Sequence, residues 1–511
     1  MNRHAAGLPP LRAGSACAHP DGLDLRYVCW DDDEVVRRLY FAVRDPDWAT
    51  IPPEAVEPVP VEAGLGWRAR FALPRGGELR AGARLRLAPD SLTCEVEVLA
   101  TSDVLYNRIG WCVLLPPTLA GSPVRYLTAA GEVAETLSPL VAPQPLGPTG
   151  PQPALGPFTA FGWTQGDHGY ELAFTGDEFE LEDQRNWTDA SFKIYSTPLA
   201  LPRPHRLAAG QSLTQTVTLR RTALGSVAPR PAAPPVSRPV GAHRTRLSAL
   251  LRDASDADLR VLASLGVEAL RIEAHPDEPG FLERAAHRLS QAERAGFARE
   301  LTLWCDALTP WDDVRRLVDL HRPDLVLILP ADARGGTATE YTGPELAALA
   351  ARELGDVGLA GGTPFNLCEL QRHDLAHLPT LTCTLTPTVH AVDTLSVLET
   401  SEALPDVVTT LRARVPGAAL ALGPFQGRER RHDDPPGFRP SIDGLPAEWL
   451  ADSIDALEAN QVERLCIADV SDLVRDGSPT RYGLAVKSRP LAGRPASTVT
   501  AETTQRKRTR T

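Results

Sequence analysis

The first 222 residues consist of short runs in which apolar and polar residues alternate, and Gly or Pro interrupts most of them. Alternation with a period of two predicts β-strands that bury one face, and helical spacing is almost missing from this part of the chain. Strands of this kind are typical of antiparallel sheets packed face to face, so we expect an N-terminal antiparallel β-sandwich over residues 1–222. The clearest runs are LDLRYVCW (23–30), RRLYFAVRD (37–45), WRARFALP (67–74), LTCEVEVLA (92–100), IGWCVLLP (109–116), YELAFTG (170–176) and SLTQTVTLRRT (212–222).

The pattern changes after residue 222. Residues 223–238 are rich in Pro and Ala, which predicts a linker between domains. Apolar strand-like runs then alternate with amphipathic helical segments, over residues 239–483. The expected strands are 239–244, 269–275, 300–307, 324–331, 357–363, 381–388, 419–425 and 464–471, and the clearest helices are 256–266, 281–296, 311–321, 343–354 and 447–460.

Eight strands with helices between them over about 240 residues indicate a (β/α)8 barrel, which typically has about 250 residues. A doubly wound sheet could use the same segments, but it would carry a Gly-rich phosphate loop after its first strand, and the sequence has none there. The expected fold class is therefore multidomain β plus α/β. We expect residues 484–511 to form a disordered tail.

Composition excludes several classes of protein. The net charge is −12, which disfavours nucleic acid and anionic membranes as partners. No stretch approaches the roughly 18 apolar residues of a membrane span, so we expect a cytoplasmic protein that binds no membrane. The eight cysteines show no metal-ligand spacing. We therefore expect no metal and no cofactor; the sequence does not indicate an oligomeric state.

Active sites of barrels lie at the carboxyl ends of the strands. Glu273 and Asp306 follow the second and third expected strands, Asn366 and Glu369 the fifth, and His390 the sixth. No GxSxG is present, and the fourth and seventh strands do not end in the acids of a retaining glycosidase. The hypothesis that remains is hydrolysis by water, with Glu369 or Asp306 as the base and His390 and Asn366 polarising or orienting a carbonyl group.

The segment EDQRNWTDASFKIY (182–195) concentrates charged residues beside aromatic rings and ends in a lysine followed by Ile and Tyr. The chain has only three lysines, and Lys193 is the only one before Lys487. Arginine carries the positive charge almost everywhere else, so Lys193 marks a position where a compact ammonium group could be required. Retention of a surface lysine by chance is the alternative.

These segments resemble the bacterial D-apionate lactonase family. FELEDQRNWTDASFKIYSTPLALP (179–202) is similar to the family signature FEMEDQRNWTDASFKTY, and YNRIGWCVLLPP (106–117), GGTPFNLCELQR (361–372) and TPTVHAVD (386–393) are similar to other family segments. The likeness extends from about residue 20 to about residue 475. It implies a β domain, then a barrel, and an enzyme of carbohydrate catabolism that opens a sugar-acid lactone.

With that resemblance, we assign Glu369 as the base, His390 as the acid or oxyanion donor and Asn366 as the orienting amide. Lys193 would meet the carboxylate or the lactone oxygen, and the remaining expected substrate-binding residues are Asp183, Arg185, Asn186, Trp187, Glu273 and Asp306. One alternative is that the 182–195 segment is a structural knot, with Asp189 paired to Arg185 and Asp183 to Lys193. A glycoside hydrolase and a non-catalytic carbohydrate-binding protein also remain open.

Overall fold

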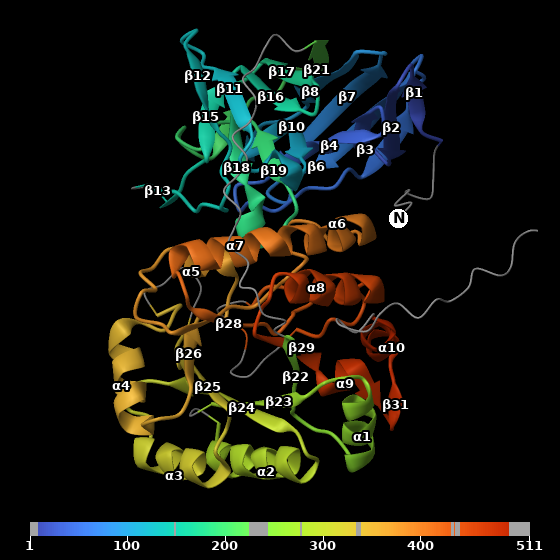
Figure 1. Ribbon diagram of the computed structural model, residues 1–511. Coiled ribbons are helices and arrows are strands. Elements are labelled where there is room, and N and C mark those ends of the chain that lie inside the picture. Colours follow the sequence, from blue (N-terminus) through green and yellow to red (C-terminus); the bar gives the residue numbers. More distant parts are fainter. Residues whose placement is uncertain are drawn as a thin grey trace, which may run out of the picture.

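The structure, a computed structural model, describes residues 9–147, 150–223, 244–275, 278–333, 339–430, 434 and 440–489. An all-β domain comes first and a closed barrel of eight parallel strands follows it. The expected fold class is therefore confirmed. In Figure 1 the sandwich lies above the barrel, and α6 and α7 run along the boundary between the two domains.

The β domain has two large antiparallel sheets. The first contains, in spatial order, β1 (Leu11–Ala13), β2 (Ala16–Asp21), β3 (Asp24–Trp30), β4 (Asp33–Arg44), β10 (Arg108–Leu115), β19 (Phe192–Tyr195), β18 (Phe179–Asp183) and β15 (Leu155–Phe158). The second contains β12 (Val133–Leu137), β11 (Pro123–Leu127), β16 (Ala160–Gln165), β17 (His168–Thr175), β21 (Ser212–Ala223), β8 (Ser91–Ala100), β7 (Glu78–Leu87), β6 (Gly64–Ala72) and β5 (Ala55–Pro58).

Two short pairs complete the domain: β9 (Val104–Tyr106) with β20 (His205–Leu207), and β13 (Leu146–Gly147) with β14 (Gly150–Pro151). Alternate residues of β7 and β8 are buried, as the period-two pattern predicts. The buried residues include Trp30, Trp67 and Trp111, which share one apolar core.

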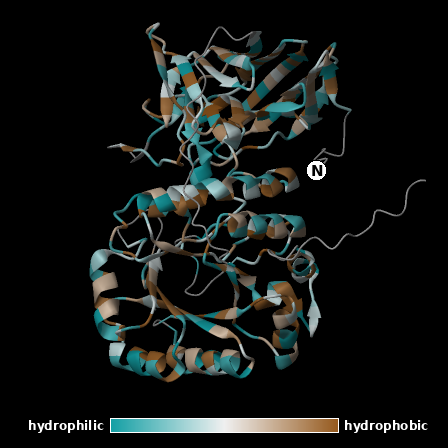
Figure 2. Cartoon of the chain, in the orientation of Figure 1, coloured by the Kyte–Doolittle hydropathy of each residue, from teal (hydrophilic) through white to brown (hydrophobic). Residues whose placement is uncertain are grey.

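The barrel closes in strand order through β22 (Arg246–Leu250), β23 (Ala269–Ala274), β24 (Ala298–Cys305), β25 (Leu325–Pro330), β26 (Leu359–Gly362), β27 (Thr380–Thr382), β28 (Ala419–Leu422) and β29 (Arg464–Asp469). Its helices are α1 (Asp256–Ser264), α2 (Phe281–Arg294), α3 (Trp311–His321), α4 (Pro344–Leu354), α5 (Leu367–Leu370), α6 (Thr394–Glu399), α7 (Leu404–Arg414), α8 (Ala447–Ala459), α9 (Val470–Leu473) and α10 (Arg481–Ser488). The 3-10 helix η3 (Thr400–Ala403) joins α6 to α7, η1 (Pro117–Leu119) lies in the sandwich, and β30 (Val474–Arg475) pairs with β31 (Ser478–Pro479). Outer helices such as α2 and α3 carry both hydrophilic and hydrophobic residues, as helices with one buried face do (Figure 2).

Three expected boundaries differ from the structure. The first barrel strand is β22 and not 239–244, of which residues 239–243 lie outside the described residues. Ala223 still belongs to β21, and the rest of the expected linker, 224–238, is also outside them. The helix α10 runs through the expected start of the tail at residue 484 and ends at Ser488, and residues 490–511 are not described.

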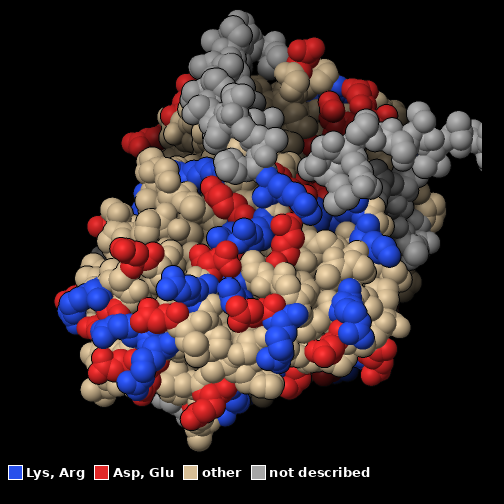
Figure 3. Space-filling model, turned by 60° about the horizontal axis from the view of Figure 1, so that its bottom comes forward, with Lys and Arg blue, Asp and Glu red and all other residues tan. Residues whose placement is uncertain are grey.

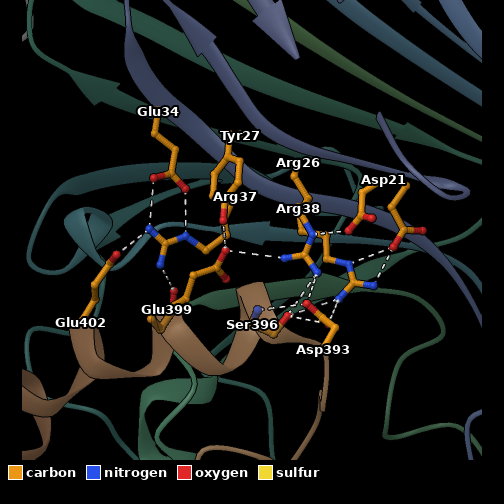
Figure 4. A network of polar contacts seen from close by, with 12 residues as sticks. Asp21, Arg26, Tyr27, Glu34, Arg37, Arg38, Asp393, Ser396, Glu399 and Glu402 are labelled. Atoms are coloured by element: carbon orange, nitrogen blue, oxygen red, sulfur yellow. Dashed lines mark hydrogen bonds and ion pairs between the residues drawn. The ribbon is translucent and has the colours of Figure 1, made fainter. Parts of the chain in front are cut away.

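The two domains meet through a set of ion pairs that we call the docking network (Figure 4). Arg26 and Arg38 both bind Asp393, at 2.7 and 3.3 Å, and Asp393 also caps α6 by accepting the backbone N–H of Ser396. Arg37 binds Glu402 of η3 at 2.7 Å, while Tyr27 donates its hydroxyl proton to Glu399 at 2.5 Å. Arginines on β3 and β4 are thus matched to acids on α6 and η3; the network consists of Arg26, Tyr27, Arg37, Arg38, Asp393, Glu399 and Glu402.

The outer surface carries charges of both signs. On the face shown in Figure 3, basic and acidic side chains are interspersed, and neither sign forms a continuous field over the described part of the chain. Among the described residues, no helix has the length and apolar character needed to cross a membrane.

Candidate functional site at the barrel mouth

The candidate site lies where β26, β27 and β28 end, on the side of the barrel mouth that faces the sandwich. Asn366 and Glu369 follow β26 at the start of α5, His390 lies in the loop after β27, and Glu429 lies in the loop after β28. We call these four residues the mouth cluster. The carboxyl ends of barrel strands are where this fold places reacting groups, and the topology brings three of the predicted residues to that end.

Asn366 links two carboxyl groups. Its backbone N–H donates to Glu369 Oε2 at 3.1 Å, and its side-chain Nδ2 donates to Glu429 Oε1 at 3.0 Å. Arg372 lies 3.4 Å from the other oxygen of Glu369, but it also binds Glu340 at 3.3 Å and is therefore shared between two acids. The carboxyl group of Glu429 is close enough for its charge to act on Glu369.

The pKa of Glu369 is raised to about 7. Burial is the largest cause because it removes water from the charged form, and the negative charges of Glu429 and Glu340 act in the same direction. Arg372 opposes this effect without cancelling it. Burial also raises the pKa of Glu429, although the nearby positive charge of His390 and the hydrogen bond from Asn366 oppose it. The site thus holds two buried carboxyl groups whose pKa values are both raised, and that of Glu369 reaches about 7.

His390 is held by the sandwich domain. Its Nδ1 makes a short hydrogen bond with Asp189 Oδ2, across 201 positions of sequence. Trp187 stands edge-on to the imidazole ring, with the ring centroids 5.9 Å apart. These contacts fix the ring plane, and they leave the opposite nitrogen, Nε2, free of the Asp189 bond. Asp189 is a residue that sequence reasoning placed only in the structural alternative, opposite Arg185.

Asp183, Arg185 and Asn186 of the 182–195 segment bind other groups of the protein, and Arg185 reaches the barrel. Arg185, in the 3-10 helix η2 (Gln184–Trp187), binds both oxygens of Asp183, at 2.6 and 2.9 Å, and reaches Asp406 of α7 at 3.0 Å. The side chains of Arg185 and Asp183 are fully buried. We call Asp183, Arg185 and Asp406 the motif lock. Asn186 donates to Gln144 at 2.6 Å and to the carbonyl of Pro143 at 3.2 Å, so it too is engaged within the sandwich.

Lys193 is buried and paired, and its ammonium group lies 2.8 Å from Glu182. Burial alone would raise the pKa of Glu182, but the positive charges of Lys193 and His390 lower it to about 2. Lys193 is thus linked to the mouth cluster through Glu182. The structural alternative paired Asp189 with Arg185 and Asp183 with Lys193, and both pairs are wrong. Asp189 binds His390, and Lys193 binds Glu182.

The contacts described for Glu273 and Asp306 are with residues outside the mouth cluster. Glu273 points into the barrel, where its charge acts on the buried Arg271, which itself binds Glu300 at 2.9 Å. Asp306 is exposed and folds its carboxylate back onto its own turn, accepting the backbone N–H of Leu308 at 2.8 Å. These contacts of Glu273 and Asp306 do not involve Glu369.

Glu429 is the member of the mouth cluster that sequence reasoning missed. It lies in the segment GPFQGRERRHDD, where several charged residues follow the seventh strand without a pattern that distinguishes one of them. Its position after the neighbouring strand was the available clue, since adjacent strand ends converge at a barrel mouth. Among the described residues, no group of His, Cys, Asp and Glu side chains is arranged to hold a metal ion.

Comparison with known proteins identifies the family of both domains. The model of the N-terminal domain of D-apionate lactonase matches residues 2–223, and the model of its TIM barrel domain matches residues 247–437. A D-apionate lactonase from Brucella anthropi is 28% identical over 448 residues, which cover 81% of this chain and 72% of the relative.

Solved structures give only a distant likeness. The match to a β-arabinopyranosidase covers 94% of this chain and 85% of the β-arabinopyranosidase chain, at 11% identity and a TM-score of 0.28. An α-N-acetylgalactosaminidase from Bifidobacterium bifidum covers 81% and 77%, at 12% identity and a TM-score of 0.27. At these scores neither structure bears on the function. Because the two domain models together match most of both domains, the chain belongs to the D-apionate lactonase family.

Proposed function

We propose that this protein hydrolyses the lactone of a small sugar acid, such as D-apionate, at the mouth of its barrel. The observation that carries the proposal is Glu369, a buried carboxyl group whose pKa is raised to about 7 beside a second carboxyl group. A general base is most effective when its pKa lies near the working pH, because it is then both ionised and basic enough to take a proton. Membership of the family supports the reaction class, and the named relative supports the substrate.

In this reaction a water molecule attacks the carbonyl carbon of the lactone while Glu369 takes one of its protons. The carbonyl oxygen becomes an oxyanion, the bond from the carbonyl carbon to the ring oxygen then breaks, and that oxygen takes a proton to become a hydroxyl group. The product is the open hydroxy acid, which loses a proton at neutral pH. His390 supplies the proton to the leaving oxygen or stabilises the oxyanion, and Asn366 keeps Glu369 and Glu429 in place.

Asp189 acts on this reaction through His390. A carboxylate bound to one imidazole nitrogen fixes the tautomer and the orientation of the ring, as it does in other hydrolytic sites. In this role Asp189 is a positioning residue. The sandwich domain then contributes to catalysis without touching the reacting atoms.

The test is a panel of purified sugar lactones in weakly buffered solution, with proton release recorded with and without EDTA. Glu369→Gln should remain folded and lose turnover by about 10² to 10⁴. Glu180→Gln is the matched control, because Glu180 is also buried but lies in the sandwich, where it accepts the backbone N–H of Leu199 at 2.8 Å. Full turnover by Glu369→Gln would reject Glu369 as the base.

A glycoside hydrolase is the second candidate, and the pair of carboxyl groups bridged by Asn366 is the observation that favours it. Nitrophenyl glycosides, assayed beside the lactones, separate the two activities. Release of nitrophenol that depends on both Glu369 and Glu429, with no lactone opened, would select the glycosidase. Binding of sugars without any turnover would select a non-catalytic carbohydrate-binding protein.

A further inference from the structure

Three buried polar side chains at the barrel mouth have hydrogen-bonding atoms without partners among the described residues. These atoms are Oδ1 of Asn366, Oγ1 of Thr386, and both Oε1 and Nε2 of Gln426. Asn366 is 2% exposed, and Thr386 and Gln426 are each 1% exposed. Buried polar groups in folded proteins are nearly always satisfied, and each exception requires an explanation.

Thr386 and Gln426 face the inside of the barrel. Leu385 and Phe425 are paired in parallel, both belong to the core between the strands and the helices, and Phe425 packs against Trp449 of α8. Side chains alternate between the two faces of a strand, so Thr386 and Gln426, each one residue further along, point inward at the carboxyl end. Their unpartnered atoms are therefore directed into the same mouth as the mouth cluster.

A second buried glutamine, Gln215, has hydrogen-bond partners for both atoms of its amide and so serves as a comparison. Gln215 of β21 is also 1% exposed, but its Oε1 accepts the backbone N–H of Trp111 at 3.0 Å and its Nε2 donates to Ser196 at 2.8 Å. Both amide atoms of Gln215 are therefore satisfied within the protein. Gln426 has the same burial and neither bond, so its amide needs partners from outside the protein, either water or a ligand.

We propose that Gln426, Thr386 and Asn366 form the binding floor for the hydroxyl groups of an uncharged, polyhydroxylated ring. The amide of Gln426 offers a donor and an acceptor, Thr386 offers a hydroxyl group that can act as either, and Asn366 offers an acceptor. A sugar hydroxyl group both donates and accepts, so neighbouring hydroxyl groups match this set. None of the three side chains is charged, and this suits a lactone, which stays neutral until the ring opens. This inference rests on the proposed function for the identity of the ring.

The test compares Gln426→Met with Gln215→Met. Methionine is close in volume and has no hydrogen-bonding amide, so Gln426→Met should melt at the same temperature as the parent protein or higher. Its KM for erythronolactone, which has two ring hydroxyl groups, should rise about five- to tenfold, a larger change than that in its KM for γ-butyrolactone, which has none. Gln215→Met should show the reverse, with a lower melting temperature and an unchanged KM.

Calorimetric binding of erythronolactone separates this inference from the proposed reaction. If the parent protein opens no lactone but binds erythronolactone better than γ-butyrolactone, and Gln426→Met removes that preference, the binding floor is supported and the lactonase is rejected. If the parent opens lactones and Gln426→Met keeps the preference for hydroxyl groups, the floor is rejected and the lactonase remains. Absence of any preference in the parent, or a lower melting temperature for Gln426→Met, also overturns the floor.

Discussion

Asp183 and Glu369 are both buried carboxyl groups near the domain boundary. They differ in how many hydrogen-bond donors each receives. Asp183 of the motif lock receives two nitrogens of Arg185 at 2.6 and 2.9 Å. Glu369 of the mouth cluster receives one backbone N–H at 3.1 Å and shares Arg372, at 3.4 Å, with Glu340. Burial raises the pKa of both groups, but Asp183 is held by two nitrogens of Arg185 and joins two elements, whereas Glu369 has fewer donors and its pKa reaches about 7.

Replacing Arg185, the cation of the motif lock, should have the largest effect of the changes considered, and this effect is on stability. Arg185→Met leaves Asp183 buried without its partner and should lower the free energy of unfolding by about 3 to 5 kcal/mol. Urea unfolding measures the loss. Arg315→Met is the control, because Arg315 is half exposed and binds Asp312 and Glu353 at the surface, where such a change typically costs about 1 kcal/mol or less. Equal losses in the two variants would mean that the motif lock is no stronger than a surface pair.

The contribution of Glu369 to stability should depend on pH. The pKa of Glu369 is about 7 in the folded protein against 4.5 as the ordinary value, so the folded state binds the proton more tightly. The stability from this group is complete below pH 4.5 and is lost as the pH rises through 7, by about 3 kcal/mol. Glu369→Gln cannot ionise, so its stability relative to the parent should increase between pH 5 and pH 8.

Urea unfolding of Glu369→Gln and of the parent at pH 5 and pH 8 checks this expectation. Glu95→Gln, at an exposed position of β8, serves as the control and should show no such change. If the gap between Glu369→Gln and the parent is the same at both pH values, the folded protein does not raise the pKa of Glu369.

Asp189 connects the two regions, because it lies in the 182–195 segment and binds His390 of the mouth cluster. Asp189→Asn places an amide opposite Nδ1 of His390, which favours the wrong tautomer, and should lower kcat about 100-fold with little change in KM. Nitrogen chemical shifts of His390 report the tautomer directly. Asp406→Asn weakens the motif lock at the same boundary and should reduce stability while leaving kcat unchanged. A loss in KM alone for Asp189→Asn would contradict a positioning role.

The smallest expected effect belongs to Lys193. A guanidinium group is larger than an ammonium group and forked, so Lys193→Arg should displace Glu182, which lies beside His390, and lower kcat/KM about tenfold. Steady-state kinetics with the lactone that the parent protein opens fastest measures this change in kcat/KM. Unchanged kinetics would place Lys193 with the structural residues of the segment.

Much of the fold follows from local pattern, but the partners of the charged residues do not. Strand runs such as 464–471 and 92–100 were predictable because burial on one or both faces leaves a periodic record in the sequence. Asn366, Glu369 and His390 were predictable as neighbours because parallel strand ends converge. The first barrel strand was placed too early, since 239–244 and β22 have similar short apolar runs.

The 182–195 segment shows why pairing was not predictable. Four acids, Glu182, Asp183, Asp189 and the distant Asp406, compete for Arg185 and Lys193. The choice depends on η2, which turns Arg185 back toward Asp183, and on β18 and β19, whose register places Glu182 directly opposite Lys193. The charged residues alone predict neither the turn nor the strand register. For the same reason Glu429 could not be distinguished from the other acids in its loop.

The bond between Asp189 and His390 also sets an order of events during synthesis. The ribosome adds His390 201 residues after Asp189, an interval of about 10 to 40 s at bacterial rates of elongation. Throughout this time the sandwich can fold and present its carboxylate while the histidine does not yet exist. The nascent chain therefore carries only one partner of this hydrogen bond, which can form only after the sixth strand of the barrel and His390 have left the exit tunnel.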